Sequence, residues 1–127
     1  ECGISTPRAF GLLDEKYNNF SAADNTDPEN NFRKMCSAYK SGITADVCCC
    51  LYNIFETVVS DICPDVPKAK HIMTGCGAYG ALLSGSGPSV VGYFDDSEAG
   101  AKKAKEAAEK LTENGYSAKV CHGITAY

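Results

Sequence analysis

The chain has 127 residues and a mass of 13.5 kDa, which is the size of one domain with a substantial core. Hydrophobic residues make up 44% and charged residues 22%, as in an ordinary soluble globular protein, and the net charge of −4 argues against nucleic acid as a partner. No apolar run reaches the ~18–20 residues that cross a bilayer, and no secretion signal opens the chain. We therefore expect a cytoplasmic protein without nucleic-acid or membrane partners. The first residue is Glu1, not Met, which suggests a processed or partial protein.

The first third of the chain predicts a short strand and two helices. Residues 3–5 are expected to close a strand that begins upstream. Ser5, a threonine and a proline then form a helix start, and apolar residues recur on one face of a helix over residues 6–19. A second helix is expected to start at Asp27-Pro28, to run to about residue 39 and to end at Ser41-Gly42.

The middle third reads as a long helix followed by a shorter one. Thr44 is the expected cap of a helix over residues 44–62, in which apolar side chains recur every three or four residues like a face packed on a core. These side chains are Val47, Leu51, Ile54, Val58 and Ile62. Pro64 and Pro67 then break the chain, and a helix over residues 66–74 leads into a glycine-rich turn.

The last third predicts two strands, a helix and a final strand. Strands over residues 81–83 and 89–94 flank the loop, Ser97 caps a helix that Gly115 ends, and residues 116–124 form the last strand. The element order predicts an α+β fold, a ferredoxin-like split βαβ sandwich. We expect an antiparallel-rich sheet with helices on one face and extra helices in the first crossover.

Eight cysteines are a heavy load for this length. They are Cys2, Cys36, Cys48, Cys49, Cys50, Cys63, Cys76 and Cys121. No Cys-x-x-Cys pair indicates a zinc site, and the run of three falls in an expected helix, where successive side chains point about 100° apart. Without a secretion signal a disulfide framework is not favoured. We expect all eight to be reduced, metal-free and structural, with metal or redox chemistry as the less favoured alternative.

The sequence contains no recognisable catalytic machinery. His71 and His122 have no nucleophile at an informative spacing, and no Walker loop, serine elbow or paired-carboxylate motif is present. Asp95 and Asp96 are interpreted as a solvated turn before a helix. We therefore expect no catalytic residue and no metal site in this chain.

The exception is the loop Ser84-Gly85-Ser86-Gly87-Pro88-Ser89. Glycines that alternate with hydroxyl residues leave the backbone bare, so that successive N–H groups can line a concavity for phosphate oxygens. The spacing alone favours the alternative of a hairpin loop in which glycines only supply positive φ. Because the loop lies outside the apolar stripes, the substitution Gly87→Val is expected to leave the domain folded.

Residues 77–96, from Gly77-Ala78-Tyr79-Gly80 through this loop to Asp95-Asp96, resemble the third, C-terminal motif of the GHMP kinases. Within that superfamily, the chain resembles the 4-diphosphocytidyl-2-C-methyl-D-erythritol kinases of the non-mevalonate isoprenoid pathway. The residues that carry this narrower resemblance are Gly3-Ile4-Ser5-Thr6 with Phe10, Leu51-Tyr52-Asn53 with Phe55-Glu56, and Pro64 with Ile72-Met73. Tyr79 and Ser89 depart from the usual leucine and threonine.

The resemblance implies that residues 1–127 are the C-terminal domain of a kinase that is about twice as long. Its partner would be its own N-terminal domain, which would hold the main ATP loop and the catalytic aspartate and lysine. ATP and Mg would serve the full-length enzyme, with none bound by this chain alone. Ser84, Gly85, Ser86, Gly87 and Pro88 would brace the ATP loop near the phosphates. Thr6 and Phe10 would help to build the cytidine pocket, with the aromatic ring stacked on the base.

The implied reaction is the phosphorylation of the 2-hydroxyl of 4-diphosphocytidyl-2-C-methyl-D-erythritol, a small-molecule substrate. Two alternatives stay open: a free-standing metabolite-binding or regulatory α+β domain, and a GHMP kinase for another small alcohol. An upstream glycine-rich ATP loop in the full gene would favour the kinase. The spacing of Phe10 alone favours an ordinary core residue of its helix, and the resemblance favours the pocket.

Overall fold

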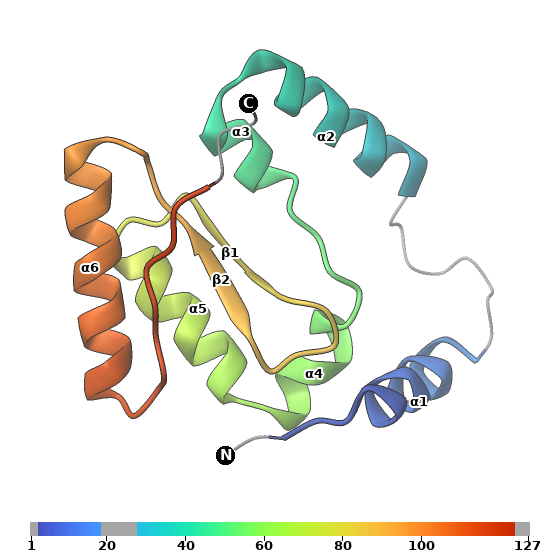
Figure 1. Cartoon of the computed structure of the whole chain (residues 1–127). Helices are drawn as coiled ribbons and strands as arrows, with labels where there is room; N and C mark the ends of the chain where they lie inside the picture. The colour runs from blue at the N-terminus through green and yellow to red at the C-terminus, as the bar shows by residue number, and fades with distance from the viewer. Residues whose placement is uncertain (1–2, 19–27, 124–127) are drawn as a thin grey trace.

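The computed structural model of the chain describes residues 3–18 and 28–123. This part of the chain contains helices and one small antiparallel sheet, so the α+β class is confirmed. The elements are α1 (Thr6–Tyr17), α2 (Pro28–Ser41), α3 (Thr44–Cys49), α4 (Glu56–Ile62), α5 (Asp65–Gly75), β1 (Gly80–Leu83), β2 (Val90–Tyr93) and α6 (Glu98–Glu113). Figure 1 shows α5 beside the β1–β2 hairpin and α6 at the left edge of the molecule.

The hairpin is held against α5 by close packing of one of its faces. In the antiparallel register Ala81 lies opposite Gly92, and Leu83 lies opposite Val90. A Cβ atom at Gly92 would lie only 2.6 Å from the Met73 sulfur of α5, so this strand position accepts glycine alone without rearrangement. α6 packs against α5 in turn, so α5 lies between α6 and the hairpin.

Two buried clusters form the core. The first joins α1, α4, the start of α5 and the end of β1, and consists of Ala9, Leu13, Val58, Val59, Cys63, Val66 and Leu83. The second joins α5 and α6, and consists of Met73, Cys76, Ala107 and Leu111. Because Leu83 is the last residue of β1 and is 1% exposed, the first cluster anchors the strand directly beneath the glycine-rich loop.

The expected long helix over residues 44–62 is wrong, because the structure divides it into α3 and α4. Between them the backbone N–H of Phe55 donates to the Asn53 side chain at 3.0 Å rather than to a carbonyl of a preceding helical turn. The predicted apolar stripe fails at the same place: Val58 is buried, whereas Ile54 is 41% and Ile62 is 37% exposed. Thr44 is the first residue of α3 rather than its cap.

The two outer strands expected for a ferredoxin-like sheet are not present in the described residues. Residues 3–5 and 116–123 carry no strand, and the sheet consists of β1 and β2 alone in this part of the chain. Residues 117–123 make no backbone hydrogen bond to either strand among the described residues. Their anchoring comes from side chains instead: Tyr116 and Ala118 pack against the second buried cluster. The ferredoxin-like arrangement is therefore not confirmed.

Several element ends follow their predicted signals. α2 ends at Ser41, and Gly42 follows it with φ +70°. The hydroxyl of Ser97 accepts the N–H of Gly100 and so caps α6, and Gly115 follows the end of that helix with φ +84°. Asp27, and the predicted end of the first helix at residue 19, lie outside the described residues. No helix in the described part of the chain is long and apolar enough to span a membrane.

The cysteines differ from the expectation at one position. Cys63 is disulfide-bonded and completely buried, so the prediction that all eight are reduced is wrong. Sequence spacing does not reveal such a bond, because a disulfide joins positions that only the fold brings together. The six other described cysteines are free thiols. Cys48 is buried and Cys49 is exposed, as expected for successive helical residues, and burial raises the pKa of the Cys48 thiol.

Candidate functional site

The glycine-rich loop closes the β1–β2 hairpin with two glycines in left-handed backbone conformations. Gly85 has φ +59° and Gly87 has φ +84°, a region that side chains disfavour. The N–H of Ser84 donates to the carbonyl of Ser89 at 2.8 Å, and the N–H of Gly87 donates to the carbonyl of Ser84 at 3.2 Å. The loop is therefore a hairpin turn in which the glycines do supply positive φ.

The hairpin alternative does not account for all of the loop's backbone groups. The N–H groups of Gly85 and Ser86 donate to no acceptor in the described part of the chain. Gly85 is exposed and Ser86 is half-buried, so both amides lie at the surface. Neighbouring free amides in a glycine turn form a concavity that suits an anionic oxygen. The residues present therefore fit a contact to phosphate.

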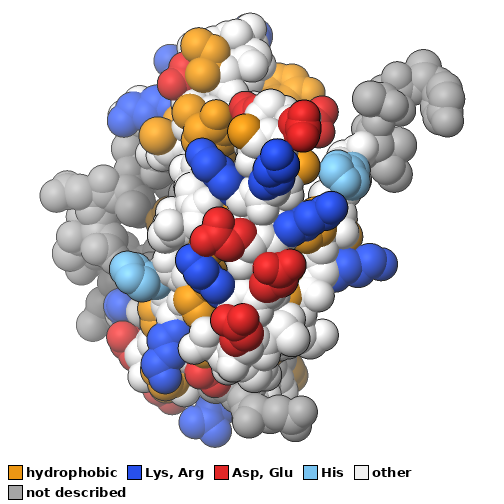
Figure 2. All heavy atoms as spheres, turned by 90° about the vertical axis from the view of Figure 1, so that its left-hand side faces the viewer, with side chains coloured by type: hydrophobic (Ala, Val, Ile, Leu, Met, Phe, Trp, Pro, Cys, Tyr) orange, Lys and Arg blue, Asp and Glu red, His pale blue; other side chains and the backbone are white. Residues whose placement is uncertain are grey.

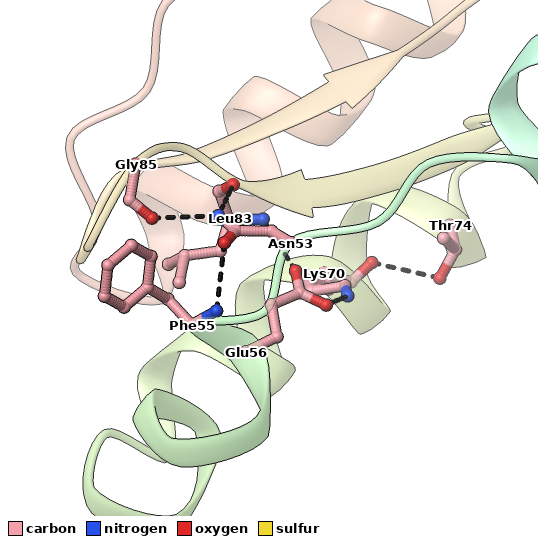
Figure 3. Close-up of polar contacts among 7 residues, drawn as sticks. All are labelled: Asn53, Phe55, Glu56, Lys70, Thr74, Leu83 and Gly85. Carbon is pink, nitrogen blue, oxygen red and sulfur yellow. Dashed lines mark hydrogen bonds and ion pairs between the residues drawn. The ribbon is translucent and has the colours of Figure 1, made fainter. Parts of the chain in front are cut away.

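Side chains from the segment before α4 and from the start of α4 hold the base of the loop (Figure 3). The Asn53 amide donates to the carbonyl of Leu83 at 2.7 Å and to that of Gly85 at 2.8 Å. Glu56 accepts the N–H of Leu83 at 2.7 Å with one carboxylate oxygen and pairs with Lys70 at 2.7 Å through the other. The base of the loop is thus held by two side chains outside the hairpin, Asn53 and Glu56, and Lys70 pairs with the second of them.

The structure brings the N-terminal end of α1 to the same loop. The Thr6 hydroxyl lies 2.9 Å from the Ser86 hydroxyl, although 80 residues separate them in the sequence. The packing of Ala9 and Leu13 in the first buried cluster fixes α1 in this position. A residue that the resemblance assigns to the cytidine pocket therefore contacts the loop that the resemblance assigns to the ATP phosphates.

Phe10 lies on the exposed side of α1 and not in the core. Its ring packs edge-to-face on Phe55, with 5.0 Å between the ring centroids and 88° between the planes, and its residue surface remains 53% exposed. The interpretation of Phe10 as an ordinary core residue is wrong, because the apolar face of α1 is buried through Ala9 and Leu13 instead. Part of its surface is therefore open to solvent.

Sequence reasoning missed Asn53, Glu56 and Lys70 as partners of the loop. Asn53 and Glu56 belong to the segment that carries the narrower family resemblance, but their spacing from the loop contains no signal. The pair Asn53 and Leu83 is separated by 30 residues, and only the packing of α4 beneath β1 brings them together.

The opposite end of the hairpin carries a second polar group. Asp95 accepts the N–H of Ser97 at 2.8 Å and the hydroxyl of Tyr79 at 3.2 Å. The hydrogen bonds to Ser97 and then to Tyr79 lower the pKa of Asp95, and the bond to Asp95 raises the pKa of Tyr79. This geometry confirms that Asp95 belongs to a turn before a capped helix.

The remaining surface features lie elsewhere. An open hollow of about 390 Å³ between α2 and α3 includes Lys34, Asp46 and Cys49 in its lining, and none of the loop residues. Figure 2 shows lysines interleaved with acidic side chains on the α6 side of the molecule, where Lys110 pairs with Glu106 at 2.7 Å. Across residues 3–18 and 28–123, no three His, Cys, Asp or Glu side chains group as metal ligands would.

Comparisons with known proteins agree on one family. Residues 21–117 match the model described as GHMP kinases C terminal. A 4-diphosphocytidyl-2-C-methyl-D-erythritol kinase of Symbiobacterium thermophilum is 33% identical over 99 residues, which cover 78% of this chain and 35% of that protein. A kinase of the same name from Exiguobacterium sibiricum is 36% identical over 69% of this chain, which covers 28% of that protein. The one from Pelobacter propionicus is 43% identical over 62% of this chain, which covers 27% of that protein. The chain thus matches about a third or less of each relative, and no solved structure matches it.

Proposed function

The chain belongs to the GHMP kinases through their C-terminal domain, and on this premise we propose that it is the C-terminal part of an ATP-dependent kinase. The substrate that we propose is 4-diphosphocytidyl-2-C-methyl-D-erythritol, phosphorylated on its 2-hydroxyl, because the relatives with 33–43% identity carry that name. The observation that carries the proposal is the glycine-rich loop, in which the N–H groups of Gly85 and Ser86 donate to no acceptor in the described residues and the Ser86 hydroxyl contacts Thr6 of α1. Residues 1–127 would form one domain of this enzyme.

Phosphoryl transfer depends mostly on positioning and on stabilising charge on the transferred group. The free amides of Gly85 and Ser86 would donate to a phosphate oxygen of ATP or to the backbone of the N-terminal ATP-binding loop. When bound, ATP supplies the phosphoryl group and the leaving group. The loop needs no charged side chain for this role, because backbone dipoles in a water-poor cleft stabilise negative charge.

Magnesium is not assigned to these residues. As the family resemblance implies, we propose that the cation is held by the N-terminal domain together with the phosphates of ATP. The catalytic aspartate and lysine are proposed to lie in that domain as well.

The substrate end of the site is proposed to lie at α1. Phe10 is exposed and would stack on the cytosine base, and its T-shaped contact with Phe55 would help to orient the ring. Thr6 contacts Ser86, so that the residues for the nucleotide end and the residues for the phosphate end share one surface. This arrangement would bring the base of the substrate close to the loop that contacts the phosphates of ATP.

The test uses the full-length protein that contains this chain. Purified protein is incubated with ATP, Mg²⁺ and 4-diphosphocytidyl-2-C-methyl-D-erythritol, and ADP release and the phosphorylated product are measured. ADP release that depends on this substrate is expected. Release with another small alcohol in its place would favour the second kinase hypothesis. No release with any alcohol, together with an upstream sequence that lacks a glycine-rich ATP loop, would favour a metabolite-binding or regulatory domain.

A further inference from the structure

The last residue of β1 lies at the outer edge of the sheet. Its backbone N–H and C=O groups form hydrogen bonds with side chains and not with a neighbouring strand. In an antiparallel strand the N–H and C=O groups of one residue point to the same side. Both groups of Leu83 are taken by residues outside the hairpin: Glu56 accepts the N–H and Asn53 donates to the C=O, each at 2.7 Å. Because no third strand covers this edge in the described residues, these two side chains take the place of a neighbouring strand.

The same amide of Asn53 reaches into the loop. Its second hydrogen bond goes to the carbonyl of Gly85 at 2.8 Å, while its own oxygen accepts the N–H of Phe55 at 3.0 Å. With two donors and one acceptor engaged, the orientation of this amide is fixed, and aspartate in its place would offer only acceptors to the two carbonyls. The Gly85 carbonyl is therefore held toward Asn53 while the residue keeps φ +59°.

The ion pair between Glu56 and Lys70 is partly buried. The Lys70 and Glu56 side chains are 29% and 21% exposed and lie 2.7 Å apart, so solvent screens this ion pair less than one on the open surface. Lys70 keeps one carboxylate oxygen occupied, which leaves the other oxygen directed at the N–H of Leu83. The base of the loop is thus held from two elements, α4 and α5 (Figure 3).

We propose that Asn53, supported by the Glu56–Lys70 pair, is a positioning residue that sets the conformation of the glycine-rich loop and so presents the free amides of Gly85 and Ser86 to a phosphate oxygen. This inference rests on the proposed kinase function. Asn53 acts through the backbone of Leu83 and Gly85 and need not touch the substrate.

The kinetic test compares Asn53→Asp with Asn114→Asp in the full-length protein. Asn114 is a matched control, because its amide also donates to a carbonyl, that of Lys110 at 2.8 Å, but at the exposed end of α6. Asn53→Asp is expected to lower kcat at least tenfold and to change KM for the cytidine substrate less than twofold. The control is expected to stay within twofold of the wild type in both constants.

A second measurement does not depend on activity. Hydrogen–deuterium exchange of the full-length protein reports on the amides of Leu83, Ser84 and Gly87, which are hydrogen-bonded in this structure. Asn53→Asp is expected to accelerate their exchange at least tenfold, without a change in α6, and the control is expected to leave them unchanged. If the wild type releases no ADP with the cytidine substrate, the proposed function fails, and the exchange result still decides whether Asn53 holds the loop.

Three results would overturn the inference. They are unchanged exchange in the loop, an equal acceleration throughout the domain, and a loosened loop with normal kcat. If Asn53→Asp does not fold, Glu56→Gln decides in its place, because glutamine keeps an acceptor for the N–H of Leu83 and loses the charge that pairs with Lys70. It is expected to accelerate exchange at Leu83 at least threefold, and unchanged exchange there would contradict the role of the pair.

Discussion

Gly85 and Gly87 have the same backbone preference but different surroundings. A Cβ atom at Gly87 would lie 2.8 Å from a methyl carbon of Leu83 and 3.6 Å from one of Val59, both of them core residues. A Cβ atom at Gly85 would meet no heavy atom within 4 Å. The expectation that the loop lies outside the packed core is therefore wrong for Gly87 and correct for Gly85.

This difference makes Gly85→Ala the cleaner test of the phosphate role. Alanine at φ +59° is strained by about 1–2 kcal/mol but clashes with nothing. In the full-length enzyme we expect kcat/KM to fall at least tenfold, which is about 1.4 kcal/mol of lost transition-state stabilisation, with only a modest loss in Tm. Gly87→Val should lower kcat/KM as much and Tm further, and Ser86→Ala should cost less. If kcat/KM of Gly85→Ala merely follows the folded fraction, the loop does not contact phosphate.

Phe10→Ala tests the nucleotide end of the site. The edge-to-face contact with Phe55 accounts for about 0.5–1.5 kcal/mol of stability, and no buried cavity follows its removal because Phe10 is 53% exposed. Stacking on a base contributes about 1–3 kcal/mol, so affinity for the cytidine substrate should fall roughly 5- to 150-fold while ATP affinity is unchanged. Isothermal titration with each ligand measures both values. Equal losses for both ligands would remove Phe10 from the cytidine pocket.

The lowered pKa of Asp95 predicts that its contribution to the free energy of unfolding is larger at neutral pH than at acidic pH. Its pKa in the folded chain lies below the ordinary value of 3.8, so the fold favours the charged carboxylate. The stabilisation is present above pH 3.8 and is lost as the pH falls through the lower, folded pKa. Urea unfolding of the wild type and Asp95→Asn should therefore show a larger difference at pH 7 than at pH 3. An equal difference at both values would mean that the charge contributes nothing.

At the scale of elements, a serine directly precedes the first residue of two helices, but only one of the two serine hydroxyls caps its helix. The Ser97 hydroxyl accepts the N–H of Gly100 at 3.2 Å at the start of α6, whereas Ser5 occupies the same position before α1 without a side-chain hydrogen bond. Ser97→Ala should cost about 1 kcal/mol of unfolding free energy, and Ser5→Ala should cost close to nothing. Thermal or urea unfolding of both variants measures this, and equal losses would contradict the assignment.

Elements with their own local signals can be predicted from the sequence. α6 has a serine cap and a terminal Gly115, and the hairpin has a glycine loop between two apolar runs, so both lie within a residue or two of the expectation. The helix over residues 44–62 satisfies the same spacing rule and still fails. Asn53 makes its hydrogen bonds to Leu83 and Gly85, and these tertiary contacts outweigh a local preference that amounts to a fraction of a kcal/mol per residue.

Some residues of the candidate site can likewise be predicted from the sequence, and others cannot. The loop itself is visible in the sequence because its glycines and serines form a motif, and the resemblance adds Thr6, which the structure places against Ser86. Asn53, Glu56 and Lys70 are not visible, because ordinary polar residues have no pattern that names a distant partner: 30 residues separate Asn53 from Leu83, and 27 separate Glu56 from Leu83. Such support is recognised only when the backbone groups of the loop are traced to their acceptors and donors.

At the scale of the whole molecule, the proposed function makes the described residues one wall of an active site that a second domain would complete. The Thr6 hydroxyl contacts the Ser86 hydroxyl of the glycine-rich loop, and the hollow between α2 and α3 includes neither of these residues in its lining. A second domain that covers this surface would exclude water from the phosphates, which strengthens the contacts of the free amides. The match to about a third or less of each relative agrees with this division of labour.

The 127-residue chain alone is therefore expected to fold and to be inactive. Two buried clusters span α1, α4, α5, α6 and the end of β1, which supports a cooperative unfolding transition by circular dichroism. Phosphoryl transfer also needs groups that bind ATP and Mg²⁺, and the described residues contain no group of three potential ligands for the cation. An ADP-release assay with ATP, Mg²⁺ and the cytidine substrate should read background for this chain and turnover for the full-length protein. Turnover by the chain alone that Gly85→Ala abolishes would instead place the reaction centre within these residues, and the loop would then act without a second domain.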